Sequence, residues 1–182
     1  MKSNLKKDLS FLKNKKLLLC ISGGIDSIFL YHNIVGLQSK YNFKIGLAHV
    51  NYNTSLMSNN STNLCRELSI LNNHPFYLKI YNYHPETNFE HLAREVRYSF
   101  FDSIKRKEKY DYILTAHNKN DLLETLYMQQ GIDDFSIFPY SKSNTCISRP
   151  LIHIDRQEIK KYINDNDYLY YNDPTNLEPK YK

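Results

Sequence analysis

The sequence predicts a doubly wound α/β domain, built on a mainly parallel sheet with helices on both faces. Short apolar runs at residues 16–21, 43–50, 75–80 and 112–116 have the length and composition of buried strands. Helix-like segments separate these runs, and such alternation is typical of parallel sheets. A Gly-Gly pair also lies directly between the first run and the first helix-like segment, where this architecture places its ligand-binding turns.

The helices follow from periodicity and capping signals. We predict them at residues 28–37, 60–71, 89–107, 120–130 and 156–165. The third carries an apolar stripe formed by Phe89, Leu92, Ala93, Val96, Phe100 and Ile104. The last begins after Asp155, which has capping-box spacing to Glu158. No repeat or linker is visible, so we expect a single domain over residues 1–182, with residues 1–15 as a lead-in.

Composition limits the possible classes. The 24 Lys and Arg residues exceed the 19 Asp and Glu residues, and this mild basic excess favours a polyanionic partner. Cys20, Cys65 and Cys146 lie far apart in the sequence, which argues against a disulfide framework, a zinc site or an iron–sulfur site. No apolar stretch approaches the ~20 residues of a membrane span. We therefore expect a cytoplasmic protein without a membrane partner.

The segment that follows the first strand is a candidate phosphate cradle. It consists of Ser22, Gly23, Gly24, Ile25, Asp26 and Ser27. A glycine turn before a helix points backbone N–H groups and the positive end of the helix dipole at an anion, and the two serines add hydroxyl donors. The lysine of the Walker pattern is missing, whereas Asp26 could hold magnesium. Spacing alone explains an ordinary strand-to-helix turn equally well.

Two further groups of charged residues lie near predicted strand ends. Asp121 and Glu124 follow His117 and share a helix face, so they could bind magnesium or a cationic substrate. The alternative is that they only complement the helix dipole.

Glu90, Arg94 and Arg97 are spaced to lie on one helix face opposite the apolar stripe, where the two guanidinium groups could grip phosphates. The alternative is a solvated face in which Thr87 and Glu90 form a capping box and Glu90 pairs with Arg94.

Residues 22–27 resemble the SGGxDS signature of the PP-loop, or N-type, ATP pyrophosphatases, which cleave ATP between its α- and β-phosphates. Further segments in the same order narrow the resemblance to the tRNA(Ile)-lysidine synthetase family. They are His49-Val50-Asn51-Tyr52, residues 90–98, residues 115–125, Arg149-Pro150-Leu151 and Asp173-Pro174-Thr175-Asn176. The resemblance runs from about Lys16 to the C-terminus and implies a Rossmann-like PP-loop fold.

The resemblance implies an ATP-dependent ligase that joins free L-lysine to C2 of the wobble cytidine in tRNA(Ile) with a CAU anticodon. It places ATP on residues 22–27 and His49, and magnesium near Asp26. Asp121 and Glu124 would organise the second substrate or metal. Glu90, Arg94, Arg97 and His117 would contact substrate or RNA. Members continue with an arginine and tRNA-binding domains, which we expect outside these 182 residues.

Two alternatives remain from the sequence. The chain could be a tRNA thiolation enzyme with the same fold, although those related to the cytidine thiolases typically carry paired Cys-x-x-Cys motifs. It could also be a degenerate nucleotide- or tRNA-binding module without catalysis.

Overall fold

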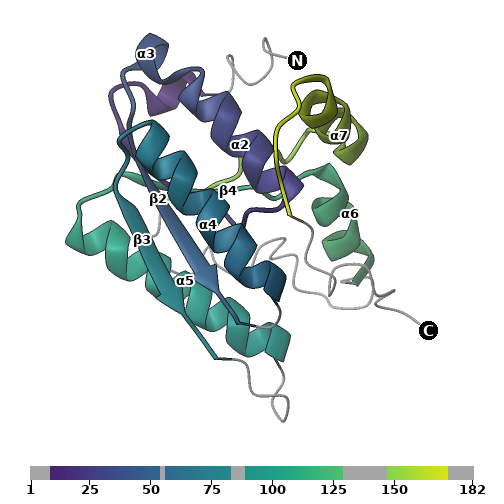
Figure 1. Ribbon diagram of the computed structural model, residues 1–182. Helices are drawn as coiled ribbons and strands as arrows, with labels where there is room; N and C mark the ends of the chain where they lie inside the picture. The colour runs from purple at the N-terminus through teal and green to yellow at the C-terminus, as the bar shows by residue number, and fades with distance from the viewer. Residues whose placement is uncertain (1–8, 54–55, 83–88, 129–146, 172–182) are drawn as a thin grey trace.

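The structure is a computed structural model that describes residues 9–53, 56–82, 89–128 and 147–171. Within these ranges, five parallel strands form one sheet in the order β3-β2-β1-β4-β5 (Figure 1). They are β1 (Lys16–Cys20), β2 (Lys44–Asn51), β3 (Phe76–Ile80), β4 (Tyr112–Thr115) and β5 (Ile147–Ser148). The predicted fold class is confirmed, as are the four predicted strands. We did not predict β5, because two residues are too short to give a sequence pattern.

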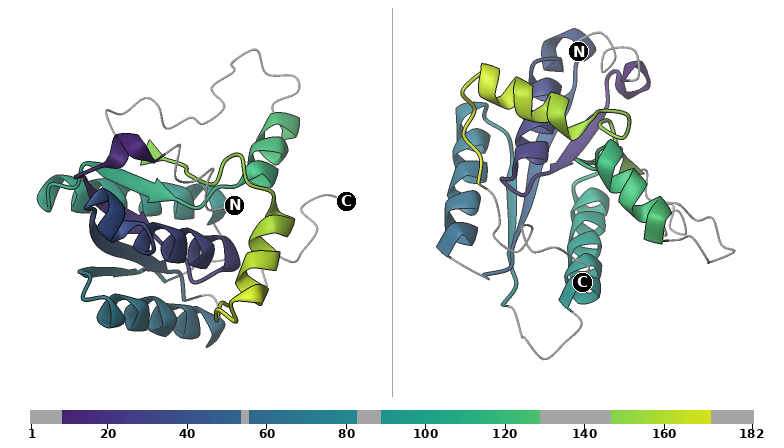
Figure 2. Two further views of the ribbon diagram at one scale, coloured as in Figure 1. Left: turned by 90° about the horizontal axis from the view of Figure 1, so that it is seen from above. Right: turned by 90° about the vertical axis from the view of Figure 1, so that its right-hand side faces the viewer.

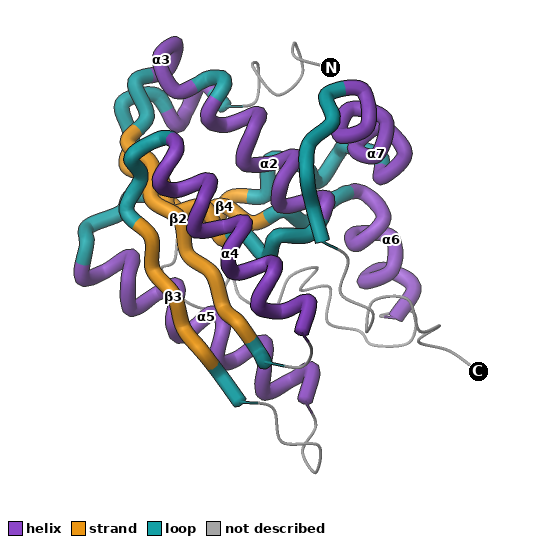
Figure 3. The backbone as a smooth tube through the Cα atoms, viewed as in Figure 1, coloured by secondary structure: helices purple, strands orange, loops and turns teal. Residues whose placement is uncertain are grey.

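The helices lie on both faces of the sheet (Figure 2). They are α2 (Ile25–Val35), α3 (Gln38–Tyr41), α4 (Leu56–Leu71), α5 (Phe89–Lys107), α6 (Lys119–Met128) and α7 (Arg156–Asp165), preceded by the 3-10 turn η1 (Ser10–Leu12). One face is covered by α2 and α4, with α7 packed against α2, and the other face by α5 (Figure 3).

Side chains of β1 alternate between the two halves of the core. Leu17 and Leu19 face the cluster formed with α2, α4 and α7, whereas Leu18 and Cys20 face the cluster formed with α5. This period of two is the geometry of a strand buried on both faces. Strand β1 is also the central strand of the sheet, so the segment that follows it emerges at the middle of the carboxyl edge.

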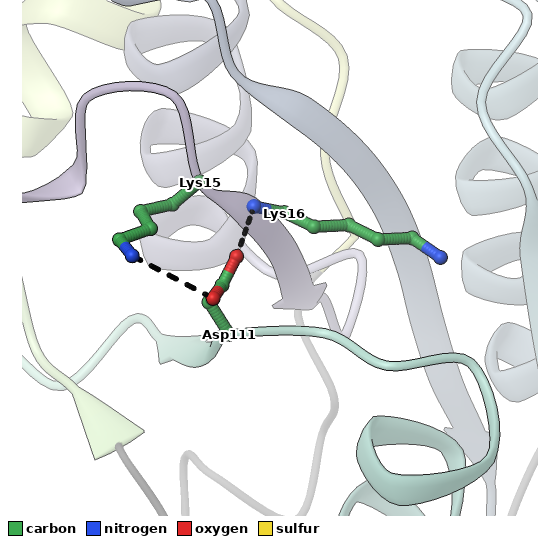
Figure 4. A network of polar contacts seen from close by, with 3 residues as sticks. All are labelled: Lys15, Lys16 and Asp111. Carbon is green, nitrogen blue, oxygen red and sulfur yellow. Dashed lines mark hydrogen bonds and ion pairs between the residues drawn. The ribbon is translucent and has the colours of Figure 1, made fainter.

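At the opposite, amino edge of the sheet, Asp111 links the starts of two neighbouring strands. Its carboxylate accepts a hydrogen bond of 2.8 Å from the backbone N–H of Lys16 and lies 3.8 Å from the Lys15 Nζ (Figure 4). In return, the Asp111 N–H donates to the Lys16 carbonyl. These contacts join the starts of β1 and β4, and therefore help to fix the register of the two strands that flank the site.

Several helix boundaries differ from the sequence prediction, including the end of α2 at Val35 rather than residue 37 and the bounds of α6, Lys119–Met128 rather than residues 120–130. Helix α2 begins at Ile25 rather than residue 28, because Gly24 has the extended backbone of an N-cap (φ −77°, ψ 163°). Helix α4 begins at Leu56 rather than residue 60, and the short α3 was not predicted. By contrast, α7 has the predicted bounds, and the Asp155 side chain caps it by accepting from the Gln157 N–H.

The buried face of α5 also differs from the predicted stripe. Ala93, Tyr98, Phe101 and Ile104 are buried, whereas Phe100 is only half-buried. Arg97 lies four residues from both Ala93 and Phe101, and Arg94 lies four residues from Tyr98, so both arginines border the buried face rather than the opposite one. The prediction that the two arginines lie opposite the buried stripe is therefore wrong.

Candidate nucleotide-binding site

The glycine turn after β1 is folded tightly onto the first turn of α2. Gly23 has a φ of 85°, a conformation in which a side chain is strained. The Ser27 Oγ accepts hydrogen bonds from the N–H groups of Ser22 (3.2 Å) and Gly23 (3.1 Å) and donates to the Gly24 carbonyl (2.8 Å). Ser27 is thus buried and holds the turn together, in contrast to the anion-donor role that we expected for its hydroxyl.

The half-buried Asp26 lies in the first turn of α2. Burial raises the pKa of its carboxyl group, against the opposing effects of Arg156, a hydrogen bond from Asn118, and Lys160. Its Oδ1 atom is buried and has no hydrogen-bond partner among the described residues. An unpaired carboxylate oxygen beside a candidate phosphate cradle is chemically suited to Mg²⁺, which is usually held by one or two carboxylates together with substrate phosphates and water.

Asn118 links this carboxylate to the start of α6. Its Oδ1 accepts from the N–H groups of Asn120 (2.8 Å) and Asp121 (3.2 Å), and the Asp121 Oδ2 accepts from the Asn118 N–H (2.8 Å). This reciprocal cap leaves the Asn118 amide nitrogen to donate to Asp26. Sequence reasoning missed Asn118, although an asparagine three residues before an aspartate is a capping signal. Asp121 serves here as a cap, and the side chain of Glu124 lies outside the described residues.

His49 is buried beside the backbone that leads into the glycine turn. Only 3% of it is exposed, its Nδ1 lies 2.8 Å from the Ile21 carbonyl, and its Nε2 lies 3.0 Å from the Thr62 hydroxyl. The carbonyl requires the proton to be on Nδ1, and burial lowers the pKa of the imidazole, so the ring is neutral. It therefore contacts the backbone that leads into the glycine turn rather than an open surface.

A second charged group lies on the α5 side of the sheet edge. The guanidinium groups of Arg94 and Arg97 lie 5.2 Å and 5.8 Å from the centre of the Tyr98 ring. The side chain of Tyr98 is also hydrogen-bonded to Arg149, which follows β5. The side chain of Tyr98 thus holds three guanidinium groups near one another, and Arg149 is a candidate residue that our site prediction did not include.

His117 belongs to the same group. Burial lowers the pKa of its imidazole to about 3, assisted by Arg149, Arg97 and Arg94. Its Nδ1 lies 2.9 Å from the Thr115 hydroxyl at the end of β4. The structure therefore brings Arg94, Arg97 and His117 together. The side chain of Glu90 lies outside the described residues, as does the segment that carries Cys146.

Within the described ranges, no three His, Cys, Asp or Glu side chains are grouped as metal ligands. The described Cys20 and Cys65 are both buried, and burial raises the pKa of each thiol. A thiol that resists ionisation is a poor ligand for an iron–sulfur cluster. No helix in the described part of the chain combines the length and apolar character needed to cross a bilayer.

A doubly wound parallel sheet with a glycine turn after its central strand defines the class of Rossmann-like α/β domains that bind ligands at the carboxyl edge. A PP-loop domain model matches residues 1–182, and the chain therefore belongs to the PP-loop domain family. The predicted recognition of this family is confirmed.

The similar curated proteins include tRNA(Ile)-lysidine synthases. That of Mycoplasma mycoides is 38% identical over 93% of this chain and 44% of its own length. That of Campylobacter jejuni is 34% identical over 95% of this chain and 54% of its own length. The chain thus spans about half the length of these relatives.

Among solved structures, the U34-tRNA thiolase NcsA from Methanococcus maripaludis, with its 4Fe-4S cluster, superposes with a TM-score of 0.84 at 17% identity. The match covers 98% of this chain and 66% of that one. At this identity the likeness establishes the fold alone.

Proposed function

We propose that this chain is the ATP-using domain of a tRNA(Ile)-lysidine synthase. The main support is the glycine turn after β1. Asp26 beside this turn has an unpaired oxygen, and a group of three arginines lies at the same edge of the sheet. The relatives of 38% and 34% identity bear the name of this enzyme. We further propose a cytoplasmic location and a CAU-anticodon tRNA(Ile) as the RNA substrate.

The chemistry has two balanced steps. The C2 carbonyl oxygen of the wobble cytidine attacks the α-phosphorus of ATP, and pyrophosphate leaves. The ε-amine of lysine then attacks C2, and AMP leaves with the former carbonyl oxygen. The first step creates a good leaving group from a poor one, and the second requires lysine to lose a proton.

Each group of residues has a separate task in this proposal. The N–H groups of Gly24 and of the first turn of α2 bind the phosphates of ATP, because those of Ser22 and Gly23 already donate to the Ser27 Oγ. Asp26 is the ligand for Mg²⁺, which would neutralise phosphate charge. Arg94 and Arg97 bind a phosphate of the RNA beside the target base, with His117 neutral at their side. Asp121 and Glu124 bind the lysine substrate as carboxylates that favour its cationic groups.

The test is AMP formation by the purified protein with ATP, Mg²⁺, lysine and a transcript of tRNA(Ile) with a CAU anticodon. We expect AMP release that requires both lysine and this tRNA, and a matched transcript with a GAU anticodon should not support it. AMP release that requires a sulfur donor instead of lysine would indicate a thiolation enzyme. ATP binding without any AMP release would indicate a binding module.

A further inference from the structure

The chain returns to the glycine turn after α7. It reverses at Asp167, which has a φ of 51°, and then runs alongside α2 toward the start of that helix (Figure 1). There the backbone N–H of Tyr171 donates a 2.9 Å hydrogen bond to the carbonyl of Gly23. We refer to residues 168–171 as the strap.

The strap is anchored on α2 by aromatic contacts. The Tyr168 ring stacks on His32, with ring centres 3.5 Å apart and an angle of 2° between the planes. Tyr162 of α7 meets Phe29 edge-on at 5.0 Å. Burial lowers the pKa of His32 to about 4, so its ring is neutral at pH 7. The strap is therefore fixed to the same helix whose first turn forms the candidate phosphate site.

The hydrogen bond to Gly23 fixes the orientation of one peptide group. In a planar trans peptide, the carbonyl of Gly23 and the N–H of Gly24 point in opposite directions. The carbonyl faces the strap, and the N–H of Gly24 faces the Ser22 Oγ at 3.2 Å, inside the turn. A peptide between two glycines has no side chain to resist rotation. Rotation would turn a carbonyl oxygen toward the bound anion in place of an N–H donor.

We propose that the strap is a positioning element for phosphate binding. The backbone N–H of Tyr171 holds the Gly23–Gly24 peptide so that the Gly24 N–H stays on the Ser22 side of the turn. There it would be shared between the Ser22 Oγ and the phosphates of ATP that leave as pyrophosphate. This inference rests on the proposed use of ATP, and assigns to residues after α7 a part in the phosphate site. The sequence motif at residues 22–27 gives no indication of this role, because the strap lies more than 140 residues further along the chain.

The test compares variants that keep or remove the Tyr171 N–H. Tyr171→Pro removes it, Tyr171→Phe keeps it, and Leu169→Pro is the matched control at an exposed position of the same strap. Affinities for ATP and for adenosine are measured by calorimetry, and stability by urea unfolding. We expect Tyr171→Pro to weaken ATP about tenfold, the effect of one lost hydrogen bond to the phosphate site. Its adenosine affinity should be unchanged, since adenosine lacks phosphates, and the other two variants should resemble the wild type.

Several outcomes would overturn the inference. Wild-type ATP affinity in Tyr171→Pro would do so, as would equal losses of ATP and adenosine affinity, which indicate a general structural effect. If Tyr171→Pro does not fold, Tyr168→Ala tests the same point, because it removes the stack on His32 while Tyr168→Phe retains it. Only Tyr168→Ala should then lose ATP affinity selectively. A wild-type protein that binds no ATP would overturn the proposed function and the strap together.

Discussion

Substitution of Gly23 by alanine tests the glycine turn most directly. A Cβ at this position would lie 2.9 Å from the Ser61 Cβ, 3.1 Å from its Cα and 3.2 Å from its carbonyl oxygen. The last two atoms belong to the backbone of α4 and cannot rotate away. Left-handed backbone costs a non-glycine residue about 1–2 kcal/mol. Overpacking costs a further ~1–3 kcal/mol. We therefore expect Gly23→Ala to lower the free energy of unfolding by about 2–5 kcal/mol.

Urea unfolding and ATP calorimetry on Gly23→Ala measure both consequences. Gly46→Ala is the matched control, because its new Cβ would collide with the Tyr110 ring on the α5 side of the sheet, away from the turn. Both variants should be destabilised, but only Gly23→Ala should bind ATP more weakly when folded. Adding Ser61→Gly removes one of the three close contacts and should recover part of the loss. Gly23→Ala with wild-type stability and wild-type ATP affinity would refute the reasoning.

Three further predictions concern the charged residues. Asp26→Ala should abolish Mg²⁺-dependent AMP formation without lowering stability in urea, because it removes a half-buried carboxylate with an unpaired oxygen; AMP formation at the wild-type rate would contradict its assignment. Arg97→Ala should weaken tRNA binding and reduce the slope of log affinity against log salt by about one, whereas Arg106→Ala at the exposed end of α5 should not. Because the pKa values of His117 and His32 are lowered to about 3 and about 4, the stability that they contribute is present above pH 6.5 and is lost as pH falls. By pH 5, the lowered pKa of each histidine should reduce the free energy of unfolding by roughly 2 kcal/mol, as measured by urea unfolding. The unfolding of His117→Gln should depend less on acid than that of the wild type.

Much of this fold could be predicted because its strands are buried on both faces. Such strands are continuous apolar runs, and residues 16–21 gave β1 almost to its observed bounds. The start of α2 was missed because Gly24, a residue that also favours turns, is its N-cap. Strand β5 was missed because it has only two residues, Ile147 packed on the core and Ser148, which are too few to show a side-chain pattern.

The site was predictable where it is local in sequence and not where distant segments meet. The glycine turn and Asp26 lie within six consecutive residues, so their pattern is visible in the sequence. The contact of Tyr171 with Gly23 uses a backbone N–H, which any residue except proline provides, and therefore has no sequence signal. Arg97 gave a misleading signal, since a charged residue is expected on the solvated side of a helix. In the first half of α5, however, that face lies beside the polar residues at the carboxyl edge of the sheet.

The position of β1 explains why the two charged groups can serve one reaction. The strand order reverses at β1, with β2 and β3 on one side and β4 and β5 on the other, and ligands of such sheets bind at this crevice. The hydrogen bond from Asn118 to Asp26 spans the crevice, since it joins the segment after β4 to the helix after β1. Arg156 and Lys160 act on Asp26 from the α7 side, whereas Arg94, Arg97 and Arg149 act on His117 from the α5 side. In the proposed reaction, ATP bound on one side and an RNA phosphate bound on the other would place the α-phosphorus of ATP near the target base over the end of β1. Neither anion would have to occupy the other's site.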